Sequence, residues 1–292
     1  MTEQATTNGA ATPDTTIVLP VWGAHAAYLP EALASLRCAE GPAPEVIVVD
    51  NASDPPLKAP DGARVVRLER RLPIGQVRNA GLPHVTTPYV MFWDADDLAL
   101  PGMLDRMREE LRRDPGVVAV AMHSRRWTPE TGPGDRWPWP RPIMYRLAPH
   151  RRALALISLM YNPFTTTGPA LMRTDAVRDA GGFAEDIAFF EDWALSASLC
   201  VRGRICMLDE VGRLYRVHGD SLSLGHLDHP DQGAWLKGLR RRARRDRRTP
   251  LWLKATLPGV YVHHKLRERR RRRPGAGAGY YEAALKSSTP AG

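Results

Sequence analysis

Short apolar runs alternate with helix-like segments along the first half of this 292-residue chain. Five runs read as buried strands, at residues 16–21 (TIVLPV), 45–50 (EVIVVD), 63–68 (ARVVRL), 89–94 (YVMFWD) and 117–122 (VVAVAM). Three intervening segments read as helices, at residues 29–36, 75–82 and 101–113, and the first has Pro30 in its first turn. Strands that alternate with helices form βαβ units. The alternation therefore predicts the α/β class, with a Rossmann-like, mostly parallel central sheet flanked by helices.

The chain shows no sign of export or of membrane insertion. Residues 1–14 have neither a basic n-region nor an apolar h-region, and we expect a disordered leader there. No apolar run approaches the roughly 20 residues of a membrane-spanning helix. The cysteines, Cys38, Cys200 and Cys206, form no CxxC pair and no disulfide framework, as is typical of a reducing compartment. These features predict a cytoplasmic protein.

Positive charge is concentrated near the C-terminus. Residues 237–273 contain 16 Lys and Arg against two acids, a surplus of 14 that leaves the rest of the chain at −5, since the whole chain carries +9. The uneven distribution argues against nucleic-acid binding by the whole protein. It also divides the chain into a leader (1–14), a body (15–225), an arginine-rich extension (226–273) and a flexible tail (274–292).

Acidic residues follow two of the predicted strands. Asp50 ends the second strand, and Asp94, Asp96 and Asp97 follow the apolar run YVMFW. Open parallel sheets bind ligands at the carboxyl ends of their strands. In an extended chain Asp94 and Asp96 would face one side, where either or both could hold Mg²⁺ or Mn²⁺ together with a diphosphate. The alternative is that these acids cap the helix that begins near Pro101 or are simply solvated.

Other polar residues have two interpretations each. The motif EDW, residues 191–193, opens a helical segment; its acids provide a general base or merely favour the positive end of the helix dipole. His218 in YRVHGDS is a ligand for a metal or phosphate, or an ordinary surface or core histidine. Arg78 pairs with a phosphate or lies on the surface of a short helix. The segment 125–142, which contains three tryptophans, reads as a long exposed loop.

Taken in order, these motifs resemble those of family 2 glycosyltransferases, which have the GT-A fold. The matching stretches are TIVLPVWG, VIVVDNASD, GQVRNAGL, YVMFWDADD followed by LP, GGF, EDW, RGRI and YRVHGDSLS. The resemblance spans residues 15–225, with a donor half at about 15–100 and an acceptor half at about 101–225. After the first strand this chain has VWGAH, where many members have a tyrosine and an asparagine.

The resemblance implies a nucleotide-diphosphate sugar donor, most commonly UDP-linked, and residues that bind it. The matching donor-site positions are Pro20 and Val21 for the base pocket, Asp50 and Asn51 for the base or ribose, and Arg78 for the base and diphosphate. Asp94 and Asp96 match the family's DxD motif, which contacts ribose and a Mg²⁺ or Mn²⁺ ion, and Asp97 shares this role in some members. His218 matches a position that completes the metal or diphosphate site.

By the same resemblance, Asp192 is the catalytic base. The implied reaction is a single displacement that inverts the anomeric carbon, while the base takes a proton from the attacking acceptor hydroxyl. A metal would offset the charge that grows on the departing diphosphate. Glu191 is expected to support the helix start or the acceptor. Trp193 is expected to stack on a sugar ring or to fill the core.

The arginine-rich extension alternates basic runs with the apolar stretch LWLKATLPGVYVHH. This pattern suits a segment that lies on an anionic membrane surface, where each basic residue contributes about 1 kcal/mol. Residues 237–273 would then place the protein at the inner face of the plasma membrane, near a lipid-linked acceptor. The alternative is a solvated tail, or one that docks on the acidic body.

Three classes of function remain open on this basis. The first is an inverting, metal-dependent glycosyltransferase acting on a cell-surface polysaccharide or lipid-linked glycan, with a secondary metabolite or peptide as the alternative acceptor and no nucleic-acid partner. The second is a nucleic-acid-binding protein, whose strongly salt-dependent binding would survive loss of Asp96 and Asp192. The third is a sugar-nucleotide-binding pseudoenzyme, which the intact DxD motif and Asp192 argue against.

Overall fold

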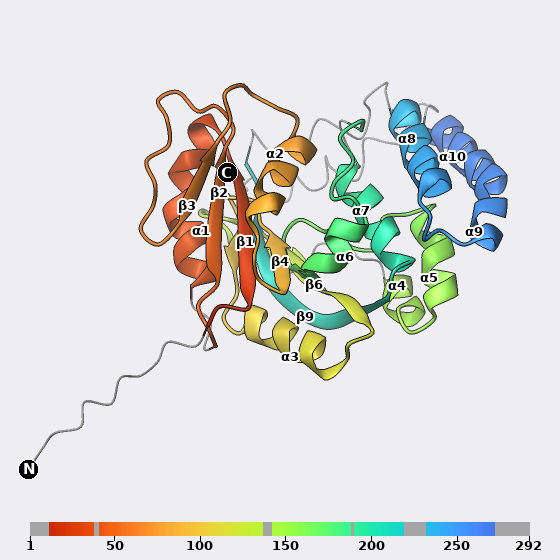
Figure 1. Cartoon of the computed structure of the whole chain (residues 1–292), viewed down its shortest axis with the longest axis horizontal. Coiled ribbons are helices and arrows are strands. Elements are labelled where there is room, and N and C mark those ends of the chain that lie inside the picture. Colours follow the sequence, from red (N-terminus) through yellow and green to blue (C-terminus); the bar gives the residue numbers. More distant parts are fainter. Residues whose placement is uncertain (1–11, 38–40, 137–141, 188–189, 219–231, 272–292) are drawn as a thin grey trace, which may run out of the picture.

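The computed structural model describes residues 12–37, 41–136, 142–187, 190–218 and 232–271 of the chain. Within these residues a nine-stranded sheet runs in the order β3-β2-β1-β4-β8-β6-β9-β5, with β7 paired to β6. Helices cover both faces of the sheet (Figure 1). The α/β class predicted from the alternating pattern is confirmed.

The first four strands in the order are parallel, as predicted. They are β3 (Arg64–Arg67), β2 (Glu45–Asp50), β1 (Thr15–Val21) and β4 (Tyr89–Phe92). Because all four run in the same direction, their carboxyl ends meet at one edge of the sheet. That edge receives the acidic residues that follow β2 and β4.

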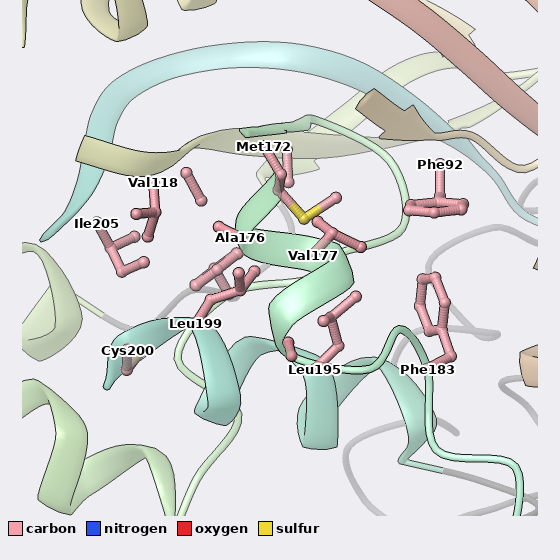
Figure 2. Close-up of a cluster of buried hydrophobic side chains, with 14 of the residues drawn as sticks. Phe92, Val118, Met172, Ala176, Val177, Phe183, Leu195, Leu199, Cys200 and Ile205 are labelled. Carbon is pink, nitrogen blue, oxygen red and sulfur yellow. The ribbon is translucent and has the colours of Figure 1, made fainter. Parts of the chain in front are cut away.

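Successive side chains of β1 point to opposite faces of the sheet and enter two separate hydrophobic cores. Ile17 and Leu19 face the helices α1 (Leu29–Leu36) and α3 (Met103–Arg113), whose apolar stripes include Leu33. Val18 faces the opposite side and joins α2 (Ile74–Gly81), α6 (Thr174–Asp179) and α7 (Glu191–Cys200). In Figure 2, Met172 and Val118 from the sheet pack against this second layer, with α7 beneath α6. The two cores pack on opposite faces of the sheet and so support the edge where the carboxyl ends of the parallel strands meet.

Beyond β4 the sheet is mixed. The strand β8 (Ala170–Arg173) is antiparallel to both β4 and β6 (Val117–Thr128), whereas β9 (Arg204–Arg216) is parallel to β6. The short β5 (Leu98–Ala99) closes the sheet by antiparallel pairing with β9. Parallel pairing therefore describes the first half of the sheet, and the second half uses both directions.

The segment 125–142 is not the continuous loop that its composition suggested. The strand β6 continues to Thr128 and turns into β7 (Gly132–Arg136), which pairs with it antiparallel. The Thr128 hydroxyl fixes this turn, since it accepts a hydrogen bond from the Thr131 amide at 3.1 Å. Trp127 lies in β6, whereas Trp137 and Trp139 lie outside the described residues. The side-chain hydrogen bond and strand pairing make this stretch a hairpin.

The basic C-terminal extension is helical and packs on the body. It comprises α8 (Gln232–Arg245), α9 (Leu251–Ala255) and α10 (Leu257–Arg271), next to α4 (Pro142–Leu147) and α5 (Arg151–Ser158). Trp235 and Leu239 of α8 are buried together with Trp193 of α7. Arg202 and Asp246 form an ion pair at 2.7 Å. The extension is therefore joined to the body by both apolar and ionic contacts.

Two short 3₁₀ helices complete the described structure, η1 (Gly23–Tyr28) after β1 and η2 (Leu82–His84) after α2.

At the N-terminus, residues 1–11 of the expected leader lie outside the described residues, and Asp14 pairs with Arg108 and Arg112 of α3. None of the described helices has both the length and the apolar character required to cross a membrane.

Candidate active site

The acids after β4 lie in a turn and not in an extended chain. The strand ends at Phe92, and the Asp97 amide donates a hydrogen bond to the carbonyl of Asp94 at 3.2 Å. The extended chain in which Asp94 and Asp96 would face one side is therefore not present, because these residues form a turn. Each of the three carboxylates has different partners.

Arg78 of α2 binds the first of these acids. Its guanidinium donates to Asp94 Oδ1 at 2.8 Å and to Glu191 Oε1 at 2.7 Å. The Arg78 side chain is only 6% exposed, so it is a buried ion-pair partner and not a surface arginine. Burial would lower the pKa of Arg78, but the charges of Asp94 and Glu191 outweigh burial and raise it. One guanidinium thus joins the acidic turn to the start of α7.

A glycine allows α7 to come this close to α2. A Cβ atom on Gly75 would lie 3.1 Å from the carbonyl oxygen of Ala184 and 3.2 Å from Cγ of Glu191. A side chain at this position would push the two segments apart. Gly75 therefore contributes to the contact that lets Glu191 reach Arg78.

Asp96 lies between two histidines. His218 Nε2 is 2.9 Å from Asp96 Oδ2, and His25 Nδ1 of η1 is 3.9 Å from the same oxygen. All three side chains are half-buried. Burial would raise the pKa of Asp96, but the hydrogen bond from His218 and the charges of both histidines lower it. The carboxylate is therefore held in its ionised form.

These three residues form a group that could hold a metal ion. One ligand atom from each lies within 4.8 Å of the others. The site fits a divalent cation, since it offers two imidazole nitrogens and one carboxylate oxygen from three different segments. Asp94 does not belong to the group, because its carboxylate is bound by Arg78. Two members of the expected metal set of Asp94, Asp96 and His218 thus lie together with His25, while Asp94 pairs with Arg78.

Asp97 is turned away from the site. It is fully buried and pairs with Arg213 of β9 at 2.9 Å, while the Arg216 amide donates to its other oxygen at 3.0 Å. Burial raises the pKa of Asp97 well above its usual range, and the charge of Arg213 opposes this. Gly168 has a φ of +108°, and a Cβ there would overlap the Arg213 guanidinium. In this structure Asp97 therefore fixes the turn to β9, and the metal-binding role expected of it stays a prediction.

Arg216 holds the far side of the acidic turn. Its Nε donates to the carbonyl of Asp96 at 2.8 Å, and its guanidinium lies over the rings of Trp127 at 4.2 Å and Tyr28 at 4.8 Å. The arginine is 5% exposed and two residues before His218. It thereby positions both the Asp96 backbone and the segment that carries the histidine.

Asp192 lies at the start of α7, next to the Arg78 bridge. Its Oδ2 accepts a hydrogen bond from Asn162 Nδ2 at 2.9 Å, and Asn162 in turn accepts one from Ser196 at 2.8 Å. Burial raises the pKa of Asp192, although the charge of Arg78 and the hydrogen bonds from Trp193 and Asn162 act in the opposite direction. A raised pKa makes the carboxylate a stronger base. The structure therefore combines orientation and basicity at Asp192.

Glu191 has a supporting role in this arrangement. Its side chain is buried against Arg78 and lies beside Asp192 in the sequence. Burial raises the pKa of Glu191 to about 7, with Arg78 lowering and Asp192 raising it. Trp193 is 4% exposed and its ring nitrogen donates to the carbonyl of Ser158. Of the two expectations for Trp193, the structure supports core filling.

Four residues expected to bind the nucleotide lie at or near the carboxyl ends of β1 and β2. Pro20 and Val21 are buried in β1. The Asp50 carboxylate is fully buried and accepts hydrogen bonds from the amides of Ser53 at 2.9 Å and Leu57 at 3.2 Å. In this structure these side chains are buried and support the backbone at this edge of the sheet.

Asn51 and a tryptophan border the same edge. The Asn51 amide group makes two hydrogen bonds with the backbone of Leu72, at 2.8 and 2.9 Å. Asn51 thus fixes the loop before α2 and has its side chain turned to the protein. Trp22, one residue beyond β1, is half-buried, and the guanidinium of Arg71 lies 5.6 Å from its ring. This aromatic surface was not singled out in the sequence.

Three site residues escaped the sequence analysis. His25 could have been found, because it follows β1 by four residues at the sheet edge that was already identified. Asn162 and Arg216 had no comparable signal. They reach the site across 30 and 120 residues of chain, respectively, and nothing in their local sequence indicates it.

Comparisons with known proteins bear on the family and the fold. The model of the family described as Glycosyl transferase family 2 matches residues 16–181, more than half of the chain. No curated protein sequence gave a significant match.

Solved structures of glycosyltransferases share the fold. S. aureus TarS 1-349 in complex with UDP-GlcNAc has a TM-score of 0.62 and 16% identity, over 94% of this chain and 77% of that one. The mannosyltransferase PcManGT from Pyrobaculum calidifontis, in complex with GDP-Man and Mn²⁺, has a TM-score of 0.56 and 19% identity, over 94% and 79%. A longer TarS chain matches with a TM-score of 0.61, over 90% of this chain and 46% of that one.

Proposed function

Because the chain belongs to glycosyl transferase family 2, we propose that it moves a sugar from a nucleotide-diphosphate donor to an acceptor hydroxyl with inversion at the anomeric carbon. The observation that carries this proposal is the double ion pair of Arg78. It brings the acidic turn, where a donor diphosphate would bind, against the start of α7, where the candidate base lies.

The donor site is proposed at the carboxyl ends of β1, β2 and β4. His25, Asp96 and His218 would hold a divalent cation there. When bound, this cation would supply Lewis-acid stabilisation of the negative charge on a diphosphate leaving group. Imidazole nitrogens suit Mn²⁺ better than Mg²⁺, which prefers oxygen ligands, so we expect Mn²⁺ to be the more effective ion.

Asp192 acts as the general base in this proposal. Its carboxylate takes the proton of the acceptor hydroxyl as the oxygen forms a bond to the anomeric carbon. The bond between that carbon and the diphosphate breaks on the opposite side, and the electron pair leaves with the phosphate oxygen. Asn162 and the Trp193 amide hold the carboxylate in place, since they donate to its two oxygens. No covalent intermediate with the protein is required.

The donor is proposed to be a UDP sugar and the acceptor a lipid-linked glycan or a cell-surface polysaccharide. Support for the donor comes from the family and from the UDP-GlcNAc bound to the similarly folded TarS. The GDP-Man bound to PcManGT makes GDP sugars the second choice. Support for the acceptor comes from the basic extension, which packs against α7, the helix that begins at the candidate base.

A screen of nucleotide sugars tests the proposal. The purified protein is incubated with UDP and GDP sugars, with Mn²⁺, with Mg²⁺ or with a chelator, and thermal stabilisation and release of the nucleoside diphosphate are measured. We expect at least one donor to stabilise the protein and to be slowly hydrolysed in a metal-dependent manner. If no donor changes either quantity with either ion, the proposed function is wrong.

A further inference from the structure

Large apolar side chains are exposed on the last two helices. Six such side chains are exposed among the described residues, and five belong to α9 and α10: Leu251 (84%), Trp252 (41%), Tyr261 (47%), Val262 (53%) and Leu266 (49%). These five are called the outer apolar face below. Single exposed apolar residues are ordinary, but a group confined to one part of the surface marks an interaction site.

The outer apolar face is separate from the face that packs on the body. In α10, Val260 and His264 are 3% exposed and point inward. Tyr261, Val262 and Leu266 recur at spacings of one and four residues and lie on the outer side of the same helix. Each of these three side chains thus leaves about half of its surface exposed in the described chain. Their exposure therefore calls for a partner outside this part of the chain.

Positive charge is abundant on the helices that carry the outer apolar face. Residues 232–271 contain 14 Lys and Arg against only Asp246 and Glu268. The guanidinium of Arg240 on α8 lies 5.0 Å from the ring of Tyr261, so the basic and apolar surfaces are adjacent. Lys237, three residues before Arg240, and Arg244, four residues after it, share its side of α8.

Some of these basic side chains form ion pairs with the body of the protein, and others do not. Arg241 pairs with Asp186 at 3.7 Å, and Arg248 pairs with Asp179 at 3.2 Å. Lys237, Arg244 and Lys254 form no ion pair with the carboxylates of the described residues. An excess of positive charge thus remains beside the apolar residues.

We propose that α9 and α10 dock on an anionic phospholipid bilayer. Apolar side chains would enter the boundary between headgroups and acyl chains, while the surrounding Lys and Arg would meet the lipid phosphates. A nucleic acid would satisfy the charge but would leave Leu251, Val262 and Leu266 exposed. A second copy of the chain would bring two strongly positive surfaces together, which is unfavourable.

Docking would also set the position of the catalytic helix relative to the membrane. The helices α8, α9 and α10 lie together at one end of the molecule, next to α7 and away from β3 and α1 (Figure 1). Trp235 and Leu239 attach α8 to α7 through a buried cluster that includes Trp193. If the proposed function holds, Asp192 therefore keeps a fixed relation to the bilayer, and the preferred acceptor is a hydroxyl carried by a lipid.

Vesicle co-sedimentation of the full chain tests the docking. The wild type is mixed with vesicles of phosphatidylcholine alone or of phosphatidylcholine with phosphatidylglycerol, at low and high salt. We expect binding to the anionic vesicles that weakens with salt. The double variant Trp252→Glu/Val262→Glu should bind them at least about tenfold more weakly, since it replaces two apolar contacts by charges that repel the lipid.

Two controls make the result decisive. Ile143→Glu changes an exposed apolar residue (48%) on α4, outside the outer apolar face, and should bind as the wild type does. Asp192→Asn should also bind normally even though transfer is lost, so that failure of docking and failure of the proposed function are distinguishable. Circular dichroism and thermal melting verify that every variant is folded.

Several outcomes would overturn the proposal. One is that the wild type does not bind anionic vesicles, or that the double variant binds them as well as the wild type does. Another is salt-dependent binding to duplex DNA or RNA that the double variant retains while vesicles are ignored. A third is a wild-type dimer in light scattering that the double variant converts to a monomer, without any vesicle binding.

Discussion

Two carboxylates in the turn Asp94–Asp97, those of Asp94 and Asp96, have opposite kinds of partner. Asp94 is bound by a buried arginine that Glu191 also binds, whereas Asp96 lies half-buried between His25 and His218. An arginine keeps its proton at every ordinary pH, so the Asp94 carboxylate stays neutralised. A histidine can lose its proton and offer a nitrogen to a metal.

This difference teaches that the DxD spacing does not define a metal site by itself. The partner of each carboxylate decides its role, because a carboxylate already paired with a guanidinium gains less from a cation. The arginine-bridged side becomes a rigid link to α7, and the histidine-lined side becomes the candidate cation site. Four predictions can break or sharpen this comparison, and the largest effect is expected next to the arginine bridge.

Asp192→Asn should abolish transfer and leave donor binding intact. The amide cannot accept the proton of the acceptor hydroxyl, and loss of a general base typically lowers the rate by about 10²–10⁴-fold. Transfer rates and donor affinity are measured on the same preparations. Asp186→Asn, which changes an exposed aspartate (59%) outside the site, should transfer normally. Normal transfer by Asp192→Asn would show that another group removes the proton.

Arg78→Met should destabilise the fold more than any other change to an ion pair in this region. It leaves Asp94 and the buried Glu191 without their shared counter-charge, and breaking a buried pair by removing one partner costs about 3–5 kcal/mol. Urea denaturation measures the free energy of unfolding. The control Arg204→Met, at an exposed pair with Asp114, should cost less than about 1 kcal/mol. Equal losses would mean that the bridge is not a structural link.

Much of the fold could be predicted because its signals are local. The apolar runs of β1 and β2 and the apolar stripe of α3 are visible within single segments, and the structure has a strand or helix at each of them as predicted. The antiparallel insertion of β8 between β4 and β6 could not be seen in this way. It depends on pairing between residues about 50 to 80 positions apart, and no local pattern specifies the partner.

The candidate site was predictable in place but not in detail. The carboxyl ends of parallel strands indicated one edge of the sheet, and Arg78 binds Asp94 and Glu191 at that edge, close to Asp192. The side-chain directions in the acidic turn could not be predicted, because they follow from a turn that Arg216 of β9 stabilises from 120 residues away. Contacts between residues far apart in the sequence thus determine the partner of each carboxylate in the acidic turn.

Glu191→Gln should change the pH dependence of stability. A carboxyl pKa raised to about 7 means that the folded protein binds this proton more tightly than the unfolded chain does. Stability is therefore lost as the pH rises from the usual pKa of Glu, about 4.5, to about 7, by at most about 3 kcal/mol. The glutamine variant lacks this titration. Its stability relative to the wild type should rise between about pH 5 and about pH 8 in urea denaturation. A constant difference would contradict the raised pKa.

Asp96→Ala and Asp94→Asn compare the two carboxylates directly. If the cation site is formed by His25, Asp96 and His218, Asp96→Ala should weaken Mn²⁺ binding by at least about tenfold, because it removes a direct ligand. Asp94→Asn should leave Mn²⁺ affinity unchanged, since Arg78 and not a metal binds that carboxylate. Isothermal titration with Mn²⁺ alone measures both affinities, and His218→Gln gives an independent loss at the same site. If Asp94→Asn weakened Mn²⁺ binding as much as Asp96→Ala did, the two acids would share the ion, and the distinction between the arginine-bridged and histidine-lined sides would fail.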